Sequence, residues 1–388
     1  MKKSLLVGEN RAAKHDFGDA RRPDLPMKEF LKSILASALG AFLAAVGAGF
    51  LLMVLIVALA SSAGNGQGAP AVTVKPKTML VIGGDLAIND TPRHGAPGID
   101  ALLFGGGGPE LDLYRALEAI DLAAKDRNIA GILLSGNLGA GVVQKAELRK
   151  ALAAFKAAGK PVIAWLENGT QGEYYLASVA DKVYVHSAGE VELKGLSSYH
   201  TYFGDTLKML GIGVQVTKVG KYKSAVEPYV GGAMSDAARE QSEALMGGIW
   251  KRIAGEVARG RGLSGAALAR TVDSAGVFDA KKAVQAKLAD KAMPRDELVK
   301  AVRAAGAAAD ESGTSFLKVS LQRYASKVRL PRGGARIAVV YAEGEIVDGW
   351  GGAGDIGGDR LAHDLRMLRG DKKTKAVVLR VNSPGGSA

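Results

Sequence analysis

Two segments of this sequence combine residue types that could perform hydrolytic chemistry. The first is residues 377–387 (VVLRVNSPGGS), where an apolar run leads into adjacent glycines. Glycines at a strand end can point bare backbone N–H groups at a ligand, because no Cβ blocks the approach. Such donors are what the oxyanion of a tetrahedral intermediate requires. The segment predicts a buried strand ending in candidate oxyanion donors, with an ordinary strand-to-helix turn as the alternative.

The second segment is residues 219–228 (VGKYKSAVEP). A lysine acts as a general base only when neutral, so its usual pKa of ~10.4 must fall by about 3 units, or ~4 kcal/mol. Burial lowers a lysine pKa best, and the like charges of Lys218 and Lys221 would help. Glu227 would raise the pKa if it paired with Lys223. The alternative is a lysine-rich face that lies in solvent.

Other reactive groups fit less well. Ser387 has a hydroxyl, but it lacks the Gly-x-Ser-x-Gly spacing of a nucleophile elbow and an evident His or Asp partner. The chain has no cysteine, which excludes disulfides, thiol nucleophiles and thiolate metal sites. Its five histidines show no metal-ligand spacing. We therefore expect neither a metal nor another cofactor.

An apolar segment near the N-terminus predicts a membrane anchor. No charged residue occurs from position 33 to 74, and residues 34–60 would span ~40 Å as a helix, against a hydrocarbon core of ~30 Å. Residues 1–32 carry eight Lys and Arg, and no positive charge follows the segment before Lys75. This asymmetry predicts a cytoplasmic tail at 1–32 and a single-pass anchor at 33–60. A cleaved secretory signal is the alternative, but its apolar run and charged region would be shorter.

Composition favours a globular protein with an anionic partner. The 388 residues are 47% hydrophobic, which excludes disorder, and the 52 glycines follow no collagen-like period and indicate many tight loops. The net charge of +12 indicates attraction to anionic lipid in a membrane-tethered chain. The charge is too diffuse for a nucleic-acid surface, so we expect no nucleic-acid partner.

After a Gly/Ser/Pro-rich linker at 61–77, short apolar runs alternate with amphipathic stretches. Such alternation predicts an α/β fold of βαβ units with buried parallel strands. The expected strands are residues 78–82, 130–135, 161–166 and 182–186, and the expected helices are about 110–126, 144–158, 200–211, 235–258, 280–289, 295–307 and 315–326.

A second α/β start at Arg336 resembles the first. Residues 80–86 (LVIGGDL) align with 340–346 (VYAEGEI), and residues 130–140 (AGILLSGNLGA) align with 376–386 (AVVLRVNSPGG). Self-similarity of this kind indicates two copies of one structural unit.

The copies predict how the chain is organised. The first copy holds an insertion, which we place in the Gly-rich loop at 104–109. We expect a first repeat at 78–330 and the start of a second at 335–388. By the first copy's proportions, roughly 200 further residues would complete the second repeat, so we expect the chain to be the N-terminal part of a longer protein.

Together these features resemble the long, two-repeat form of the bacterial signal peptide peptidase A family. Three segments carry the resemblance: residues 167–178 (ENGTQGEYYLAS), 221–228 (KYKSAVEP) and 379–387 (LRVNSPGGS). It implies a crotonase-like or Clp-protease-like superhelical repeat of ββα units behind the anchor. It also implies a serine endopeptidase of the bacterial inner membrane that cleaves remnant signal peptides in the periplasm with a Ser/Lys dyad.

The resemblance assigns roles to particular residues. Lys223 is the general base that deprotonates the serine and returns the proton to the leaving amine. Gly385 or Gly386 supplies an oxyanion-hole N–H. The serine itself lies in a Ser-Gly-Gly turn of the second repeat, beyond Ala388. In the first copy Gln171, which has no nucleophilic atom, stands at the place of that turn.

The resemblance also implies partners. Because the dyad is divided between the copies, both must dock, and the family assembles as a homo-oligomer with an apolar groove for hydrophobic signal peptides. Ser387 is then expected to cap the following helix. Two alternatives remain: a catalytically inactive membrane scaffold, and a crotonase-type acyl-CoA enzyme, against which the anchor and the Lys-Tyr-Lys-Ser segment argue.

The 388-residue chain by itself should have no serine-hydrolase activity, because the expected nucleophile lies beyond its last residue. A fluorophosphonate probe, which labels activated serines, should therefore leave the chain unlabelled while labelling a known serine hydrolase in parallel. Labelling would instead place a nucleophile among the chain's own serines.

Overall fold

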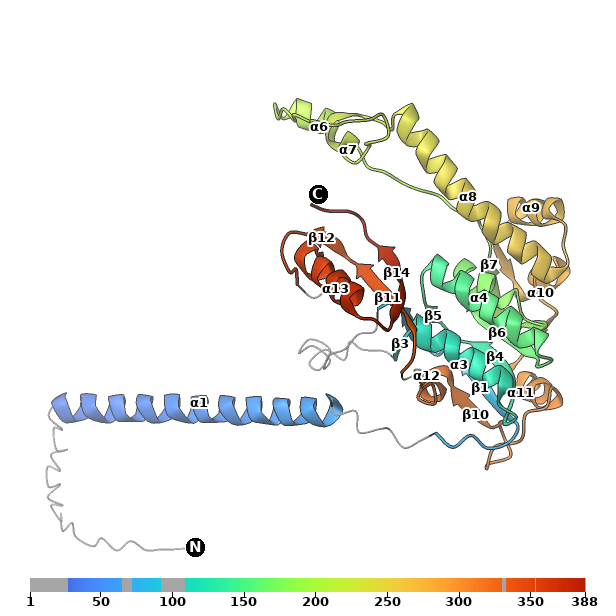
Figure 1. Ribbon diagram of the computed structural model, residues 1–388, viewed down its shortest axis with the longest axis horizontal. Coiled ribbons are helices and arrows are strands. Elements are labelled where there is room, and N and C mark those ends of the chain that lie inside the picture. The colour runs from blue at the N-terminus through green and yellow to red at the C-terminus, as the bar shows by residue number, and fades with distance from the viewer. Residues whose placement is uncertain (1–26, 65–71, 92–108, 330–332, 353, 388) are drawn as a thin grey trace, which may run out of the picture. The chain divides into compact units, whose positions relative to one another are not determined.

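The computed structural model describes residues 27–64, 72–91, 109–329, 333–352 and 354–387 (Figure 1). The chain forms two units, Met1–Gly66 and Gln67–Ala388. Most of the predicted cytoplasmic tail, the middle of the predicted linker and all but the last residue of the Gly-rich loop at 104–109 lie outside the described residues.

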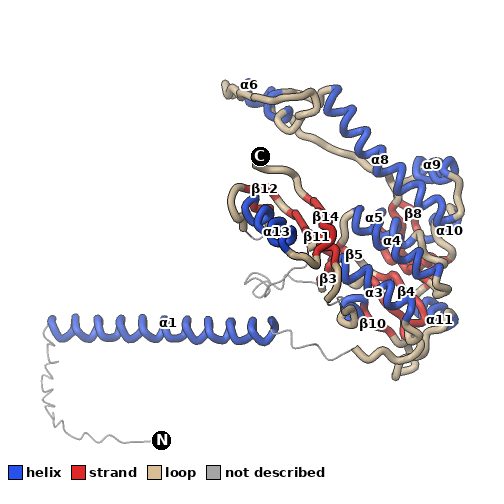
Figure 2. Tube along the Cα trace, viewed as in Figure 1, coloured by secondary structure: helices blue, strands red, loops and turns tan. Residues whose placement is uncertain are grey.

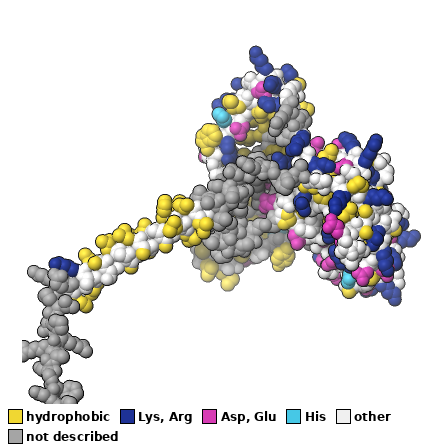
Figure 3. All heavy atoms as spheres, turned by 90° about the horizontal axis from the view of Figure 1, so that it is seen from below, with side chains coloured by type: hydrophobic (Ala, Val, Ile, Leu, Met, Phe, Trp, Pro, Cys, Tyr) yellow, Lys and Arg dark blue, Asp and Glu magenta, His cyan; other side chains and the backbone are white. Residues whose placement is uncertain are grey.

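In the first unit, helix α1 (Met27–Gly64) is long and apolar enough to cross a membrane. Its segment Phe30–Leu55 has a mean hydropathy of 2.4 and carries exposed apolar side chains, which follow the rod in Figure 3. The helix is longer than the predicted anchor at both ends. It extends from Met27 to Gly64, and the sequence contains no proline between these residues that would interrupt the helix.

The second unit is built on a seven-stranded sheet. Its strands are β1 (Thr78–Ile82), β4 (Ile129–Ser135), β6 (Val162–Gly169), β7 (Lys182–Glu192), β8 (Val277–Asp279), β9 (Lys291–Met293) and β10 (Lys318–Ser320). Their order is β10-β1-β4-β6-β7-β8, with β9 also paired to β7. Every pair is parallel except β7 with β8. The predicted α/β class with parallel strands is confirmed.

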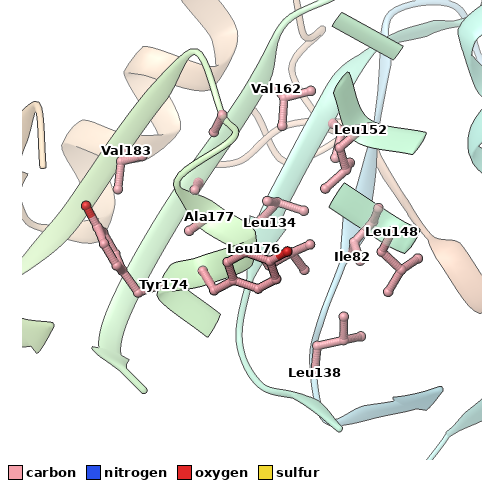
Figure 4. Packing of buried hydrophobic residues seen from close by; sticks show 14 of the residues in the cluster. Ile82, Leu134, Leu138, Leu148, Leu152, Val162, Tyr174, Leu176, Ala177 and Val183 are labelled. Atoms are coloured by element: carbon pink, nitrogen blue, oxygen red, sulfur yellow. The ribbon is translucent and has the colours of Figure 1, made fainter. Parts of the chain in front are cut away.

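Both faces of this sheet are covered. The covering helices are α3 (Leu113–Lys125), α4 (Val142–Ala157), α5 (Gln171–Ala177), α11 (Arg295–Ala304) and α12 (Leu321–Ala325). Leu80 and Leu134 pack on one face among side chains of α3, α4 and α5, part of which Figure 4 shows. Met79 and Leu133 pack on the other face with α11. This alternation follows from the two-residue period of a strand.

The predicted elements agree well up to about residue 190 and less well beyond it, although α5 and three short strands before residue 190 were not predicted. Strands β1, β4 and β6 and helices α3 and α4 lie within a few residues of the expected ranges. The helix predicted at 315–326 is wrong in its first half, where β10 pairs with β1 and only α12 is helical. The helix predicted at 280–289 is shorter, as α10 (Ala280–Gln285), and α9 (Gly265–Ser274) was not predicted.

Residues 196–235, called the arm below, leave the sheet after β7 and return through α8 (Asp236–Arg261). The arm contains only α6 (Gly204–Met209) and α7 (Glu227–Val230), and most of it is loop in Figure 2. Figure 1 shows α6 and α7 at the end of α8 farther from α9. The predicted helix at 200–211 is reduced to α6, whose last residue, Met209, is 87% exposed and so gains no stabilisation from burial.

Residues 336–386 repeat the pairing order of the first α/β segment. Strand β11 (Arg336–Glu343) pairs in parallel with β14 (Thr374–Asn382), as β1 does with β4. Strand β12 (Glu345–Val347) pairs in parallel with β13 (Asp355–Gly357), as β2 (Leu86–Asn89) does with β3 (Glu110–Asp112). A parallel bridge from Ile346 to Gly386 occupies the place of the pairing between β2 and β5 (Leu138–Gly139). Helix α13 (Gly358–Gly370) stands where α3 does.

The prediction that the strand before the adjacent glycines is buried is wrong for β14 in this chain. Val378 and Val381 are 50% and 60% exposed, and α13 has no buried residue. The reason is that β14 pairs with β11 alone, so the two strands form a sheet of their own with little cover.

A buried arginine ties α8 to the helices that cover the sheet. Arg149 of α4 donates hydrogen bonds to the Tyr175 carbonyl, to Ser178 Oγ at 2.7 Å and to the Glu256 carbonyl of α8 at 2.7 Å. The Tyr175 hydroxyl donates to Glu256 Oε2 at 2.6 Å. This network is the polar part of an otherwise apolar contact between α5 and α8.

The substitution Arg149→Ala should lower the free energy of unfolding by ~3–5 kcal/mol, because it removes the donor to three buried or half-buried acceptors and the buried cation beside the Glu256 carboxylate. Urea denaturation followed by tryptophan fluorescence would measure the loss. Lys125→Ala is the control, since Lys125 forms an exposed pair with Asp121 and its removal should change stability little. Equal effects of the two substitutions would contradict the importance of this network.

Candidate active site

The turn that follows β14 is held against β12 through its backbone. Ile346 N donates to the Gly385 carbonyl at 2.9 Å, and Ser387 N donates to the Ile346 carbonyl at 2.8 Å. The Gly385 N–H donates to Ser383 Oγ at 3.1 Å. In the part of the chain that the structure describes, the exposed Gly386 N–H has no hydrogen-bond partner. Of the two predicted oxyanion donors, Gly386 is therefore the one whose N–H is available.

Backbone geometry explains why adjacent glycines stand here. The φ angles of Gly385 and Gly386 are 111° and 152°, in a region that other residues rarely adopt. A Cβ on Gly386 would also lie 2.0 Å from the Ile346 carbonyl oxygen. The close approach of β12 thus requires glycine at position 386.

Ser387 makes a contact that its sequence pattern did not predict. Its Oγ donates to Asp348 Oδ1 at 3.2 Å, and the side chain is exposed. The helix cap expected for it stays a prediction.

Lys223 lies on the arm, where its side chain is exposed. Among the described residues its ammonium has no partner, and only its backbone N–H is bonded, to the Gly220 carbonyl at 3.4 Å. Lys221 differs, because its Nζ lies 3.4 Å from Glu240 Oε2, and Tyr222 and Glu240 together raise its pKa. The arm by itself therefore does not provide the burial that a general base requires at position 223.

The acidic residue nearest in sequence is engaged elsewhere. Glu227 accepts a hydrogen bond from Ser235 Oγ at 2.8 Å and lies 3.8 Å from Lys218 Nζ. The hydrogen bond from Ser235 lowers the pKa of the Glu227 carboxyl, with a smaller contribution from Lys218. Glu227 thus does not form the pair with Lys223 that would have kept this lysine protonated.

Gln171, at the start of α5, holds the base of the arm. Its Oε1 accepts hydrogen bonds from the backbone N–H groups of Lys194 and Gly195 at 2.8 and 2.9 Å. Its Nε2 donates to the Gly195 carbonyl at 2.9 Å. These three bonds fix the point at which the chain leaves the sheet toward Lys223.

Sequence reasoning missed a polar cluster at the junction of the two α/β segments. Arg380 of β14 donates hydrogen bonds to Asp90 and Glu147, both at 2.8 Å. A single arginine inside an apolar strand was the available signal, since a charge there needs a partner. A cleft of about 620 Å³ adjoins the cluster, and its lining residues are 88–90, 139–144, 343 and 380–382.

The structure does not join the two predicted parts of the site. Lys223 lies on the arm, whereas Gly385 and Gly386 follow β14, and in the described residues no hydrogen bond or ion pair connects them. The chain holds a candidate base and candidate oxyanion donors on separate elements.

Comparisons with known proteins define the class. Residues 154–309 match Peptidase family S49. Protease 4 of Salmonella typhi is 36% identical over 352 residues, covering 87% of this chain and 56% of that protein. Serine protease SPPA, chloroplastic, of Arabidopsis thaliana is 26% identical over 287 residues, covering 72% of this chain and 42% of that protein. The chain thus spans about half the length of these curated relatives.

These matches place the chain among α/β proteins related to serine proteases. More closely, the chain is similar to the SppA-type proteases, and the resemblance to that type of protease read from its sequence is confirmed. Among solved structures, an enoyl-CoA hydrotase/isomerase family protein from Silicibacter pomeroyi has 15% identity and a TM-score of 0.32, covering 52% of this chain and 75% of that one. A likeness at this TM-score does not define the fold.

Gly386→Ala should disrupt the turn, because the new Cβ meets the Ile346 carbonyl and the backbone angle becomes strained by ~1–3 kcal/mol. Amide hydrogen exchange at Ile346 and Ser387, whose N–H groups bond across this contact, should become faster. Gly370→Ala is the matched control, since nothing lies within 4 Å of its Cβ position. Unchanged exchange in Gly386→Ala would show that the turn does not require glycine.

Proposed function

We propose that this chain supplies the general base and an oxyanion donor of a membrane-bound serine endopeptidase. In this proposal Lys223 is the base, and the N–H of Gly386 is the oxyanion donor because that of Gly385 is bonded to Ser383. The nucleophilic serine follows residue 388 in the complete protein. The substrates are remnant signal peptides. One observation carries the proposal: the segment that matches Peptidase family S49 contains the arm and its partner-free lysine.

The residues divide the reaction as follows. Neutral Lys223 accepts the serine proton while the serine oxygen attacks the scissile carbonyl, and the oxyanion accepts a hydrogen bond from the Gly386 N–H. The resulting lysine ammonium protonates the leaving amine, which breaks the peptide bond and leaves an acyl-enzyme. Lys223 then deprotonates water, which attacks the ester, and the proton returns to the departing serine oxygen.

This mechanism requires that Lys223 be buried when the enzyme is assembled, because a solvated lysine is protonated at neutral pH. The arm that bears Lys223 also carries exposed apolar side chains, including Tyr199, Met209 and Val219. Exposed apolar surface of this kind is typical of an interface. It supports a homo-oligomer in which protein surface from a neighbouring protomer covers the arm and excludes water from the lysine.

The exposed pair β11 and β14 supports the second-repeat part of the proposal. Two strands with apolar side chains in solvent are marginal by themselves. The shared pairing order of residues 78–139 and 336–386 favours a second crotonase-like ββα unit whose remaining elements follow residue 388 and cover these strands.

Helix α1 supports the proposed location of the protein in a membrane. Its apolar stretch favours a single-pass anchor in the bacterial inner membrane, and the basic N-terminal residues favour a cytoplasmic N-terminus with the second unit in the periplasm. A protease tethered there contacts membrane lipid and meets signal peptides that remain in the bilayer after their release.

In the complete protein, Lys223→Ala should reduce kcat for peptide hydrolysis by about 10²–10⁴-fold, the usual contribution of a general base. Lys221→Ala should keep most of the activity, although it lies on the same arm two positions away. Circular dichroism should show both variants folded. Activity retained in Lys223→Ala would exclude the dyad. If the unsubstituted complete protein hydrolyses no peptide, the membrane-scaffold alternative is favoured.

A further inference from the structure

Strand β14, which leads into the glycine turn, is connected to the first α/β segment through a nearly buried aspartate. Asp90 is 6% exposed and accepts a hydrogen bond from Arg380 Nη2 at 2.8 Å. Arg380 Nη1 donates to Glu147 of α4, also at 2.8 Å. One guanidinium on β14 therefore bridges two carboxylates of the first segment. The two carboxylates raise the pKa of Arg380 further, so its charge is permanent.

A second connection runs beside the first. The Thr91 hydroxyl donates to Glu343 Oε2 at the end of β11. The other oxygen of Glu343 accepts from Asn382 Nδ2 at 3.3 Å. Asn382 is the last residue of β14, so this chain of hydrogen bonds reaches the residue directly before the Ser-Pro-Gly-Gly turn.

We infer that Asp90, Thr91, Arg380 and Glu343, called the latch below, are positioning residues that set the orientation of the Gly386 N–H relative to the first segment. The inference rests on the proposed function, because orientation matters only if this N–H binds an oxyanion. Oxyanion-hole donors act at hydrogen-bond distance, so a small displacement of the strand end weakens the interaction with the transition state.

The geometry argues against a role in stability alone. Arg380 Nε is buried and has no hydrogen-bond partner in the described residues, which is a cost that an apolar side chain would avoid. Apart from its pairing with β11, most of β14 is exposed. The latch is thus a directional contact at a place where apolar packing is scarce, and it involves the ends of both β11 and β14.

Amide hydrogen exchange on this chain tests the inference. Arg380→Gln and Asp90→Asn should each speed exchange at the bonded amides of Gly385 and Ser387 by about tenfold. The double variant should resemble Arg380→Gln, because that substitution already removes the bond between Arg380 and Asp90. Arg380→Lys, which keeps the charge, should lie between them and the unsubstituted chain. Thr91→Val, which loses only a hydroxyl, should also speed exchange at the same amides. It tests the inference without a change of charge, in case a charge variant fails to fold.

Arg336→Gln is the matched control. Arg336 pairs with Asp371 at 2.6 Å, and both residues lie within the second segment, at the end of the strand pair opposite the turn. This substitution should leave exchange at the Gly385 and Ser387 amides within about twofold. Exchange unchanged in the latch variants, or raised as much by Arg336→Gln, would overturn the inference.

Kinetics of the complete protein give a second readout. Arg380→Lys and Thr91→Val should lower kcat for peptide hydrolysis with KM within about twofold, since the donor acts on the transition state. A loss confined to KM would overturn the inference. The exchange measurement requires no hydrolysis, so it decides the positioning role even if the proposed protease function fails.

Discussion

Parallel pairing determines where this protein can present reactive backbone groups. The carboxyl ends of parallel strands meet at one edge of a sheet, so the chain turns away from β1 and β4, or from β11 and β14, in a confined space. Carbon atoms added at Gly83, Gly344 and Gly386 would lie 2.2, 1.7 and 2.0 Å from carbonyl oxygens. Bare backbone is therefore a steric requirement there, and the exposed N–H of Gly386 is a consequence of it. The candidate oxyanion donor arises from the way the strands pack, independently of any catalytic need.

Much of the framework was readable from the sequence because strand and helix periods are local properties. The βαβ alternation, β1 and the repeated segment after Arg336 were all evident from apolar spacing. The structure of the arm was not evident, because its short helices have no extended buried face and so show no regular spacing of apolar residues. Nor could the pattern show that the apolar residues of β14 are exposed, since burial depends on which neighbouring strands are present. Arg380 was visible as an isolated charge, but its partners Asp90 and Glu147 lie over two hundred positions away, and only the fold reveals them.

The candidate site is divided, and this division has a physical rationale. The pKa of a lysine falls strongly only where water is excluded, whereas Lys223 lies on an exposed part of the arm. Lys223 is exposed in the described chain, so the proposed docking would have to cover it before it could act as a base. The glycine turn needs no burial to present its donor, because a backbone N–H does not titrate. Base and donor therefore differ in how much assembly each requires.

Helix α8 adds a geometric constraint of another kind. Ile253 and Val257 near its C-terminus are buried, while no residue from 239 to 248 is, and the arm joins its far end. An α-helix turns by about 100° and rises 1.5 Å with each residue. One inserted residue in the exposed stretch would rotate the end of the helix that bears the arm by about 100° around the helix axis. Exchanging an exposed side chain there would leave the length of the helix unchanged. The length of this helix, more than its composition, therefore sets the direction around the helix axis in which the arm presents Lys223.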